Sequence, residues 1–131
     1  MREILFRGKR TKNGTWTCGY LFCIWERTYL CWGTTNNVPN MKDVLPETVC
    51  QFTGLHDKNG RKIFEGDILG GFLDEEYPEH ETVVVVEWHE NMWVTRQGKY
   101  LPDLLELCDL DCFEVIGNIY DNPELLEVNK R

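Results

Sequence analysis

The chain has 131 residues, a length that suits one domain, and 42% of them are hydrophobic, enough for one core. Five Trp, five Tyr and six Phe, with apolar stretches rich in β-branched residues such as 82–88, favour strands over helices. A net charge of −8 makes free nucleic acid a poor general partner, because duplex binding requires Lys and Arg to neutralise phosphates.

The sequence contains no apolar stretch near the roughly 20 residues needed to cross a bilayer. Residues 1–7 lack the apolar run of a signal peptide, so we expect a cytoplasmic protein that does not bind membranes. There the cysteines should stay reduced and act as small apolar residues. Their spacing lacks the paired CxxC motifs that tetrahedral zinc prefers, and we expect no metal and no cofactor. The six cysteines are Cys18, Cys23, Cys31, Cys50, Cys108 and Cys112.

Residues 4–24 predict a β-hairpin. Ile4 and Phe6 alternate with charged residues, and a turn at 12–14 precedes apolar residues at every second position. These positions are Trp16, Cys18, Tyr20, Phe22 and Ile24. Residues 28–33 predict another strand. Residues 34–40 have turn composition, which predicts a mobile loop or a domain boundary.

The middle of the chain predicts short strands joined by tight turns. Residues 48–53 predict a strand and 56–62 an exposed hairpin turn. Part of that turn, 57–60, is similar to a calcium loop but lacks its later Glu, so a hairpin explains it better. The core returns at 63–64 and again at 68–69.

Four consecutive valines at 83–86 give the strongest signal for a central strand. The loop before them, 74–81, holds five carboxylates in eight residues and must be solvated. After a turn, residues 92–95 predict a partner strand.

The end of the chain predicts a short helix over 101–108, because Leu101, Leu104, Leu105 and Cys108 have helical spacing after Pro102. Residues 112–119 predict a last strand, and Asn122-Pro123 starts a helical turn. Five or six short strands with little helix predict a mainly β fold, a small and partly open barrel.

Three segments resemble the YopX family of bacteriophage and prophage proteins in their order and spacing: 2–8, 47–68 and 114–126. The resemblance runs from Arg2 to Glu127, although Cys50 stands where the family has a small Gly and Cys18 where an aromatic is common. It implies one domain over 1–131, with an N-terminal β-hairpin portion at 1–47 and an SH3-like β-barrel at 48–131. It also implies a phage or prophage source and self-association. The family is functionally uncharacterised, so the resemblance supplies no catalytic residues.

Glu65 and Asp67 could form a carboxylate pair for acid–base chemistry or a divalent metal. The better interpretation is structural, because no third carboxylate or histidine lies close enough in sequence to complete a site. Gly66 then takes a backbone conformation closed to other residues, while Asp67 accepts backbone N–H groups at a tight bend. Gly54 and Gly60 are assigned to turns in the same way.

The candidate binding residues are Trp25, Trp32, Arg7 and Arg10. The two tryptophans fall off the clean alternation and could stack on single-stranded nucleic acid, although most Trp residues here should be core or interface residues. The two arginines belong to a basic N-terminal segment, whereas residues 103–127 are strongly acidic. Pairing of the two ends within or between subunits is the expected use of these charges.

These observations predict a non-catalytic module that forms a homo-oligomer in the bacterial cytoplasm and binds a phage or host protein. One alternative is a module associated with single-stranded nucleic acid, or one that mimics nucleic acid through its acidic loop and tail. A third hypothesis is a metal-dependent hydrolase built on Glu65, Asp67 and a histidine.

Overall fold

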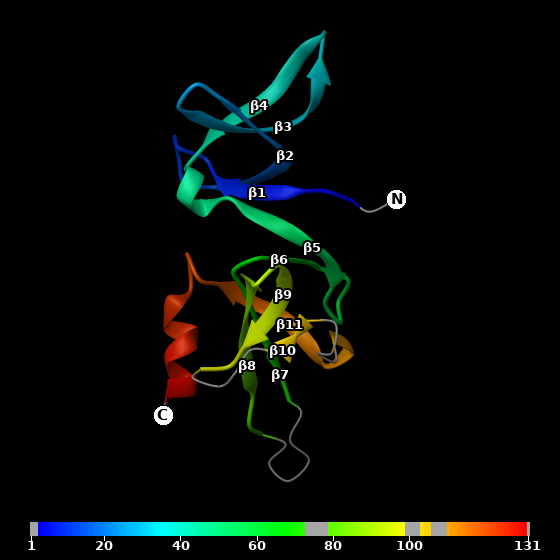
Figure 1. The fold of residues 1–131 in the computed structure, drawn as a ribbon, viewed down its shortest axis with the longest axis vertical. Coiled ribbons are helices and arrows are strands. Elements are labelled where there is room, and N and C mark those ends of the chain that lie inside the picture. The colour runs from blue at the N-terminus through cyan, green and yellow to red at the C-terminus, as the bar shows by residue number, and fades with distance from the viewer. Residues whose placement is uncertain (1–2, 73–78, 99–102, 106–109, 131) are drawn as a thin grey trace. The chain divides into compact units, whose positions relative to one another are not determined.

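The computed structural model describes residues 3–72, 79–98, 103–105 and 110–130, with the side chains of all of these except Leu104 and residues 127–130. Contacts divide the chain into two compact units, Met1–Gly54 (unit 1) and Leu55–Arg131 (unit 2). The division falls within a strand, Cys50–His56. The described residues are mainly β and form two antiparallel sheets (Figure 1).

Unit 1 contains a curved sheet in which the strands follow the order β4-β3-β2-β1-β5. A short 3-10 helix, η1, precedes β5, which continues past the end of the unit. The elements are β1 (Phe6–Lys9), β2 (Trp16–Ile24), β3 (Arg27–Thr35), β4 (Val38–Val44), η1 (Pro46–Thr48) and β5 (Cys50–His56).

The predicted N-terminal hairpin is confirmed: β1 and β2 pair antiparallel, with Lys9 opposite Trp16. The prediction of a loop or boundary at 34–40 was wrong, because this segment forms a tight hairpin between β3 and β4. Asn36 and Asn37 take positive φ angles of 54° and 66°, which short polar residues tolerate in tight turns.

The buried residues of unit 1 include Leu30 and Val44, which are almost fully buried. Hydrogen bonds tie the end of β4 to the end of β1: Leu45 N–H donates to Lys9 O at 2.8 Å, and Thr11 N–H donates to Asp43 O at 2.9 Å. Gly8 fits this closure, since a Cβ there would lie 3.3 Å from Val44 Cβ. These contacts hold the base of the β2–β3–β4 ribbon in place.

Unit 2 is built on a five-stranded sheet with the order β10-β9-β8-β7-β11 (Figure 1). The predicted strands at 83–86, 92–95 and 112–119 are confirmed, and so is the helical start at Pro123. The elements are β6 (Lys62–Phe64), β7 (Asp67–Gly71), β8 (Thr82–His89), β9 (Met92–Arg96), β10 (Asp103–Leu104), η3 (Leu110–Cys112), β11 (Phe113–Asn118) and η4 (Pro123–Lys130). The core residues are Ile63, Leu69, Val84, Val86, Leu105, Phe113 and Val115.

Two predictions for unit 2 need correction. The predicted helix at 101–108 is wrong at Asp103–Leu104, which form β10 opposite Thr95 and Val94; residues 101–102 and 106–108 lie outside the described residues. The SH3-like barrel is not confirmed, because strand pairing closes neither sheet into a barrel among the described residues.

The structure describes only part of the predicted acidic loop at 74–81. Most of the acidic loop, residues 74–78, lies outside the described part, while residues 79–81 are exposed. No helix within the described ranges has the length and apolar character needed to cross a membrane.

Candidate functional site

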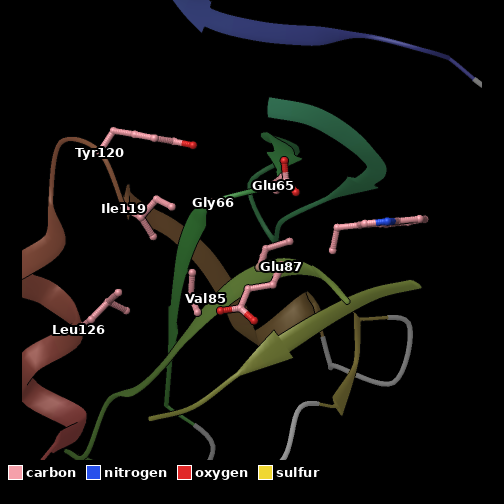
Figure 2. Close-up of a pocket in the computed structure, with 9 residues that line it drawn as sticks. Glu65, Gly66, Val85, Glu87, Ile119, Tyr120 and Leu126 are labelled. Carbon is pink, nitrogen blue, oxygen red and sulfur yellow. The ribbon is translucent and has the colours of Figure 1, made fainter. Parts of the chain in front are cut away.

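A pocket of about 380 Å³ opens on unit 2 and is formed by three segments that are far apart in sequence (Figure 2). One is the turn between β6 and β7, another is the second half of β8, and the third follows β11. The lining residues are Glu65, Gly66, Val85, Val86, Glu87, Trp88, Ile119, Tyr120 and Leu126. The volume lies within the range of small-molecule and side-chain sites, about 300–1,000 Å³.

Gly66 joins the three segments through its backbone. Its N–H donates to Val86 O at 2.8 Å, and its carbonyl accepts a bond from Ile119 N–H at 2.9 Å. The φ angle of Gly66 is +83°, a conformation that residues with a Cβ rarely adopt, so glycine suits this corner. Asp67 stabilises the same turn, because its Oδ2 accepts the Phe64 N–H at 2.7 Å.

The third segment is held by asparagine side chains after β11. Asn122 Oδ1 accepts the Asn118 N–H at 3.2 Å, and Asn118 Oδ1 accepts the Tyr120 N–H at 3.0 Å. Gly117 leaves room for this turn, since a Cβ there would come within 2.5 Å of Asn122 Oδ1. Tyr120 therefore sits on a fixed backbone beside the pocket.

The pocket holds two carboxylates in different electrostatic states. Glu87 Oε2 accepts a bond from Arg96 Nε at 2.9 Å, so its charge is balanced. Glu65 is partly buried and has no hydrogen bond or ion pair among the described residues. Burial raises the pKa of Glu65 above its usual value, because a carboxylate loses hydration there and gains no partner.

The remaining walls are apolar and aromatic. Figure 2 shows Val85, Ile119 and Leu126 along one side of the cavity. The half-exposed Trp88 packs edge-to-face against Trp93, with ring centroids 4.8 Å apart and planes at 68°. Such a contact fixes the orientation of an exposed indole ring.

Asp57 lies outside the pocket and organises the turn that leads to β6. Its Oδ1 accepts the N–H groups of Asn59 and Arg61, both at 2.9 Å, and its Oδ2 accepts the Val115 N–H at 2.9 Å. Burial alone would raise the pKa of Asp57, but the three backbone donors, aided by the Arg61 charge, hold it below its usual value. Asp57 thus joins the turn to β11.

Gly60 and Gly66 lie in turns, as predicted, with positive φ angles of 80° and 83°. Gly54 also has a positive φ, 90°, but it lies within β5 and not in a turn, so its assignment to a turn was wrong. Asp67 is 1% exposed and takes part in the bend described above, while Glu65 is partly buried and lines the pocket. The structure therefore separates the two carboxylates that the sequence placed together. It brings Glu65 close to Glu87 and Trp88, a combination for which the sequence gave no signal because the segments are distant.

The predicted binding arginines are not freely displayed. Arg7 is 8% exposed, and its guanidinium lies 4.8 Å from the centroid of the Trp16 ring. Lys9 Nζ lies 5.4 Å from the same ring centroid, so two cations flank one tryptophan. Arg10 is partly buried, and its backbone forms an isolated antiparallel β-bridge with Val44.

Trp25 and Trp32 both belong to unit 1 and not to the pocket. Trp25 occupies the turn between β2 and β3, where it is 98% exposed and has a φ of 57°. Trp32 lies beside the irregular pairing in β3, with Lys42 Nζ 5.9 Å from its ring centroid. The structure thus presents both tryptophans to solvent, in different surroundings.

No group of three or more His, Cys, Asp or Glu side chains suited to a metal ion occurs in the described part of the chain. The five described cysteines, Cys18, Cys23, Cys31, Cys50 and Cys112, are free thiols.

The fold and pocket define a mainly β protein of two sheet units, with a partly buried carboxylate in a surface pocket of the second. The chain belongs to the YopX protein family, whose model matches residues 6–127. This confirms the family resemblance.

Two crystal structures share the fold. Protein EF1440 from Enterococcus faecalis is 22% identical, with a TM-score of 0.59 over 96% of this chain and 99% of that one. Protein yopX from Bacillus subtilis is 19% identical, with a TM-score of 0.58 over 93% and 95%. A search of curated protein sequences gives no match.

Proposed function

We propose that this chain is a non-catalytic binding module and that the pocket of unit 2 receives a cationic group, the side chain of a lysine or arginine on a partner protein. The observation that carries the proposal is Glu65. A partly buried carboxylate without a partner is unfavourable, and a bound cation would replace its lost hydration.

The other walls suit the same ligand. The aliphatic stem of Lys or Arg packs well on apolar side chains such as Val85 and Ile119. Trp88 and Tyr120 offer aromatic surface, which attracts a cation placed over its face. The charge of unit 2 also favours a cationic ligand, because the unit has seven Lys and Arg against eighteen Asp and Glu, a net charge of −11.

Catalysis is less well supported by the same pocket. Glu87 is occupied by Arg96, and among the described lining residues there is no histidine, cysteine or serine to act with Glu65. A metal-dependent hydrolase would need Asp67, which accepts the Phe64 N–H. These contacts favour binding over bond cleavage.

A titration with a short lysine peptide, followed by NMR shifts of the pocket amides, tests the proposal. We expect saturable shifts around Glu65 and Ile119, and none with the same peptide acetylated on every lysine. Glu65→Gln should weaken binding about tenfold, which corresponds to about 1.4 kcal/mol.

Glu79→Gln is the matched control, because Glu79 is exposed, lies outside the pocket lining and carries the same charge. It should leave the affinity within about twofold of the parent chain. Equal losses for the two variants would mean that the peptide responds only to the net charge of unit 2, and the pocket would then not be the site.

Self-association is the second part of this proposal. Unit 1 has seven Lys and Arg against four Asp and Glu, a net charge of +3, so unit 1 of one copy complements unit 2 of another. Arg10→Glu combined with Lys12→Glu should reduce the mass seen in sedimentation velocity at low salt. A mass that stays the same in the double variant would rule out this contact.

The strand order of unit 2 also supports a finer assignment of its fold. The order β10-β9-β8-β7-β11, with η3 before the last strand and that strand returning beside β7, supports an open SH3-like arrangement for unit 2. The family resemblance supports a phage or prophage source and a role inside the bacterial cell, with a phage or host protein as the partner.

A further inference from the structure

The β2–β3 hairpin of unit 1 carries a row of aromatic side chains on one face. Strand alternation places Trp16, Tyr20, Phe22 and Ile24 on the same side of β2. The register puts Phe22 opposite Tyr29 and Ile24 opposite Arg27, so β3 extends the same face. We call this surface the hairpin face.

The hairpin face is open to solvent at Tyr20, which is 64% exposed, and at Ile24, which is 47% exposed. Trp16, Phe22 and Tyr29 on the same face are partly buried. The rings of Phe22 and Tyr29 stack with centroids 5.5 Å apart and planes at 24°, so they form a flat double layer. A contiguous apolar patch exposed on a domain often marks a site where a partner binds.

Trp25 extends this surface at the hairpin turn. Its positive φ of 57° is a strained conformation for a bulky residue, and glycine would fit the turn better. Its side chain is 98% exposed, so core packing does not compensate for the strain. Strain without packing is a feature of functional positions.

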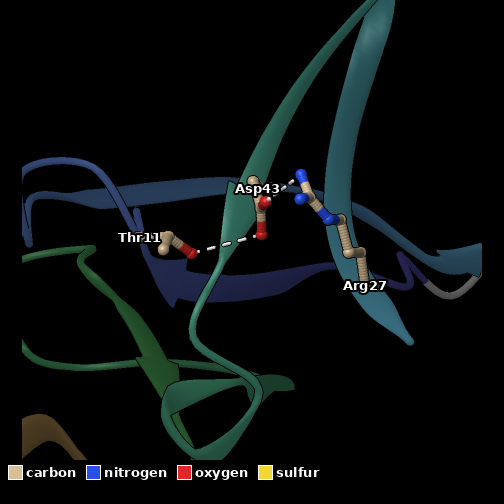
Figure 3. A network of polar contacts seen from close by, with 3 residues as sticks. All are labelled: Thr11, Arg27 and Asp43. Atoms are coloured by element: carbon tan, nitrogen blue, oxygen red, sulfur yellow. Dashed lines mark hydrogen bonds and ion pairs between the residues drawn. The ribbon is translucent and has the colours of Figure 1, made fainter.

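Positive charges lie at both ends of the hairpin face. Lys9 Nζ lies 5.4 Å from the ring centroid of Trp16, and the buried Arg7 guanidinium lies 4.8 Å from the same centroid. The Arg27 side chain is 71% exposed, and its Nη1 lies 3.5 Å from Asp43 Oδ2 (Figure 3). Asp43 also accepts a hydrogen bond from Thr11, at 3.2 Å, so this carboxylate is already engaged on both oxygens.

We propose that the hairpin face binds single-stranded nucleic acid, with bases stacked on Tyr20, Trp25 and the Phe22–Tyr29 pair and phosphates near the cations of unit 1. Stacking platforms flanked by positive charge are the usual basis of single-strand binding, and they tolerate any base sequence. The net charge of +3 on unit 1 complements phosphate, whereas the −11 of unit 2 excludes a strand from that unit.

The test uses the full-length chain and a fluorescently labelled oligothymidylate of about 12 nucleotides, within the site sizes known for β-barrel binders, about 4–16. Anisotropy at low ionic strength should report binding. Raising the salt concentration should weaken binding: the logarithm of the association constant should fall linearly with the logarithm of the salt concentration, with a slope of about −0.7 for each phosphate neutralised. A duplex of the same length should bind less tightly, because its bases are not free to stack.

Ring-specific variants separate stacking from apolar contact. Tyr20→Leu and Trp25→Leu keep apolar surface, and leucine keeps the Cβ that strains the turn at residue 25. Each should weaken binding about tenfold, while Tyr20→Phe retains the ring and should stay within about twofold. Val38→Ala is the matched control, since Val38 is an exposed apolar residue of the neighbouring hairpin.

Thermal unfolding of each variant checks that it folds, which the exposure of these side chains leads us to expect. No anisotropy change at low salt would overturn the proposal. So would affinity that is insensitive to both leucine variants, or binding to phosphatidylserine vesicles without binding to the oligonucleotide. The outcome is independent of the pocket, because Glu65→Gln should not change oligonucleotide affinity.

Discussion

Replacement of Asp57 by alanine should remove a group of three hydrogen bonds that links the turn before β6 to β11 in unit 2. Asp57 is 7% exposed and accepts three backbone N–H groups, all at 2.9 Å. A hydrogen bond to a charged group contributes about 1.5–3 kcal/mol, and a buried donor left without a partner costs about 1–3 kcal/mol. The Val115 donor is buried, whereas those of Asn59 and Arg61 are partly buried and can be satisfied by water.

We therefore expect Asp57→Ala to lower the free energy of unfolding of unit 2 by about 3–5 kcal/mol, a large share of the ~5–15 kcal/mol typical of a domain. Asp57→Asn should cost less, about 1–3 kcal/mol, because one amide oxygen still accepts while the NH₂ group opposes a backbone donor. Urea unfolding followed by tryptophan fluorescence and circular dichroism measures the difference.

The matched control is Glu114→Ala, which removes an exposed hydrogen bond from Asn59 Nδ2 at the same junction, and it should cost at most about 1.5 kcal/mol. Amide hydrogen exchange adds a local readout, since the Val115 N–H should lose protection only in the Asp57 variants. An Asp57→Ala protein within 1 kcal/mol of the parent, with Val115 still protected, would refute the reasoning.

The lowered pKa of Asp57 also predicts how stability varies with pH. The stabilisation from this carboxylate is complete above the pKa of the unfolded chain, near 3.8, and is lost as pH falls through the lower folded value. The stability gap between the parent and Asp57→Asn should therefore be full at neutral pH and close in strong acid. A gap that is constant over this range would show that the charge is not the cause.

Three further outcomes follow from the same structure. Glu65→Gln should raise the melting temperature at neutral pH and have little effect below the usual pKa of 4.5, because a raised folded pKa means that stability is lost as pH rises through it. Gly66→Ala should lower the free energy of unfolding by about 1–2 kcal/mol in urea, since its φ of +83° disfavours a Cβ. Trp25→Gly should raise the free energy of unfolding by about 0.5–1 kcal/mol. A loss of stability in this variant would show that the Trp25 side chain packs against the protein in solution.

Local sequence patterns correctly predicted the strands whose own residues have a clear alternation or a strong preference for strands. The alternation of 16–24 and the four valines at 83–86 gave strands in the right places. The segment 34–40 was misjudged because Pro39 and its neighbours suggest a loop. Pro39 lies in β4, at the edge of its sheet, where a missing N–H is tolerated.

The errors at the end of the chain have a different cause. Leucine spacing after Pro102 favours a helix, but Asp103–Leu104 instead form a strand against β9, so tertiary pairing overrides local propensity. The pocket could not be predicted at all, because it joins residues 65, 88 and 119, which only the folded sheet brings together. The separation of Glu65 from Asp67 likewise depends on which backbone groups surround each one.

Asp57, Glu65 and Asp67 are all carboxylic acids, but their surroundings give them two different roles. Asp57 and Asp67 accept backbone N–H groups, and their burial is offset by those bonds. Glu65 is partly buried and has no such bond from the described residues, so its charge lowers the stability of unit 2 at neutral pH. Local conflicts of this kind are expected at functional positions. If a lysine peptide stabilises the parent protein against heat but not Glu65→Gln, the conflict is resolved by the ligand, and Glu65 is a binding residue rather than a defect of the fold.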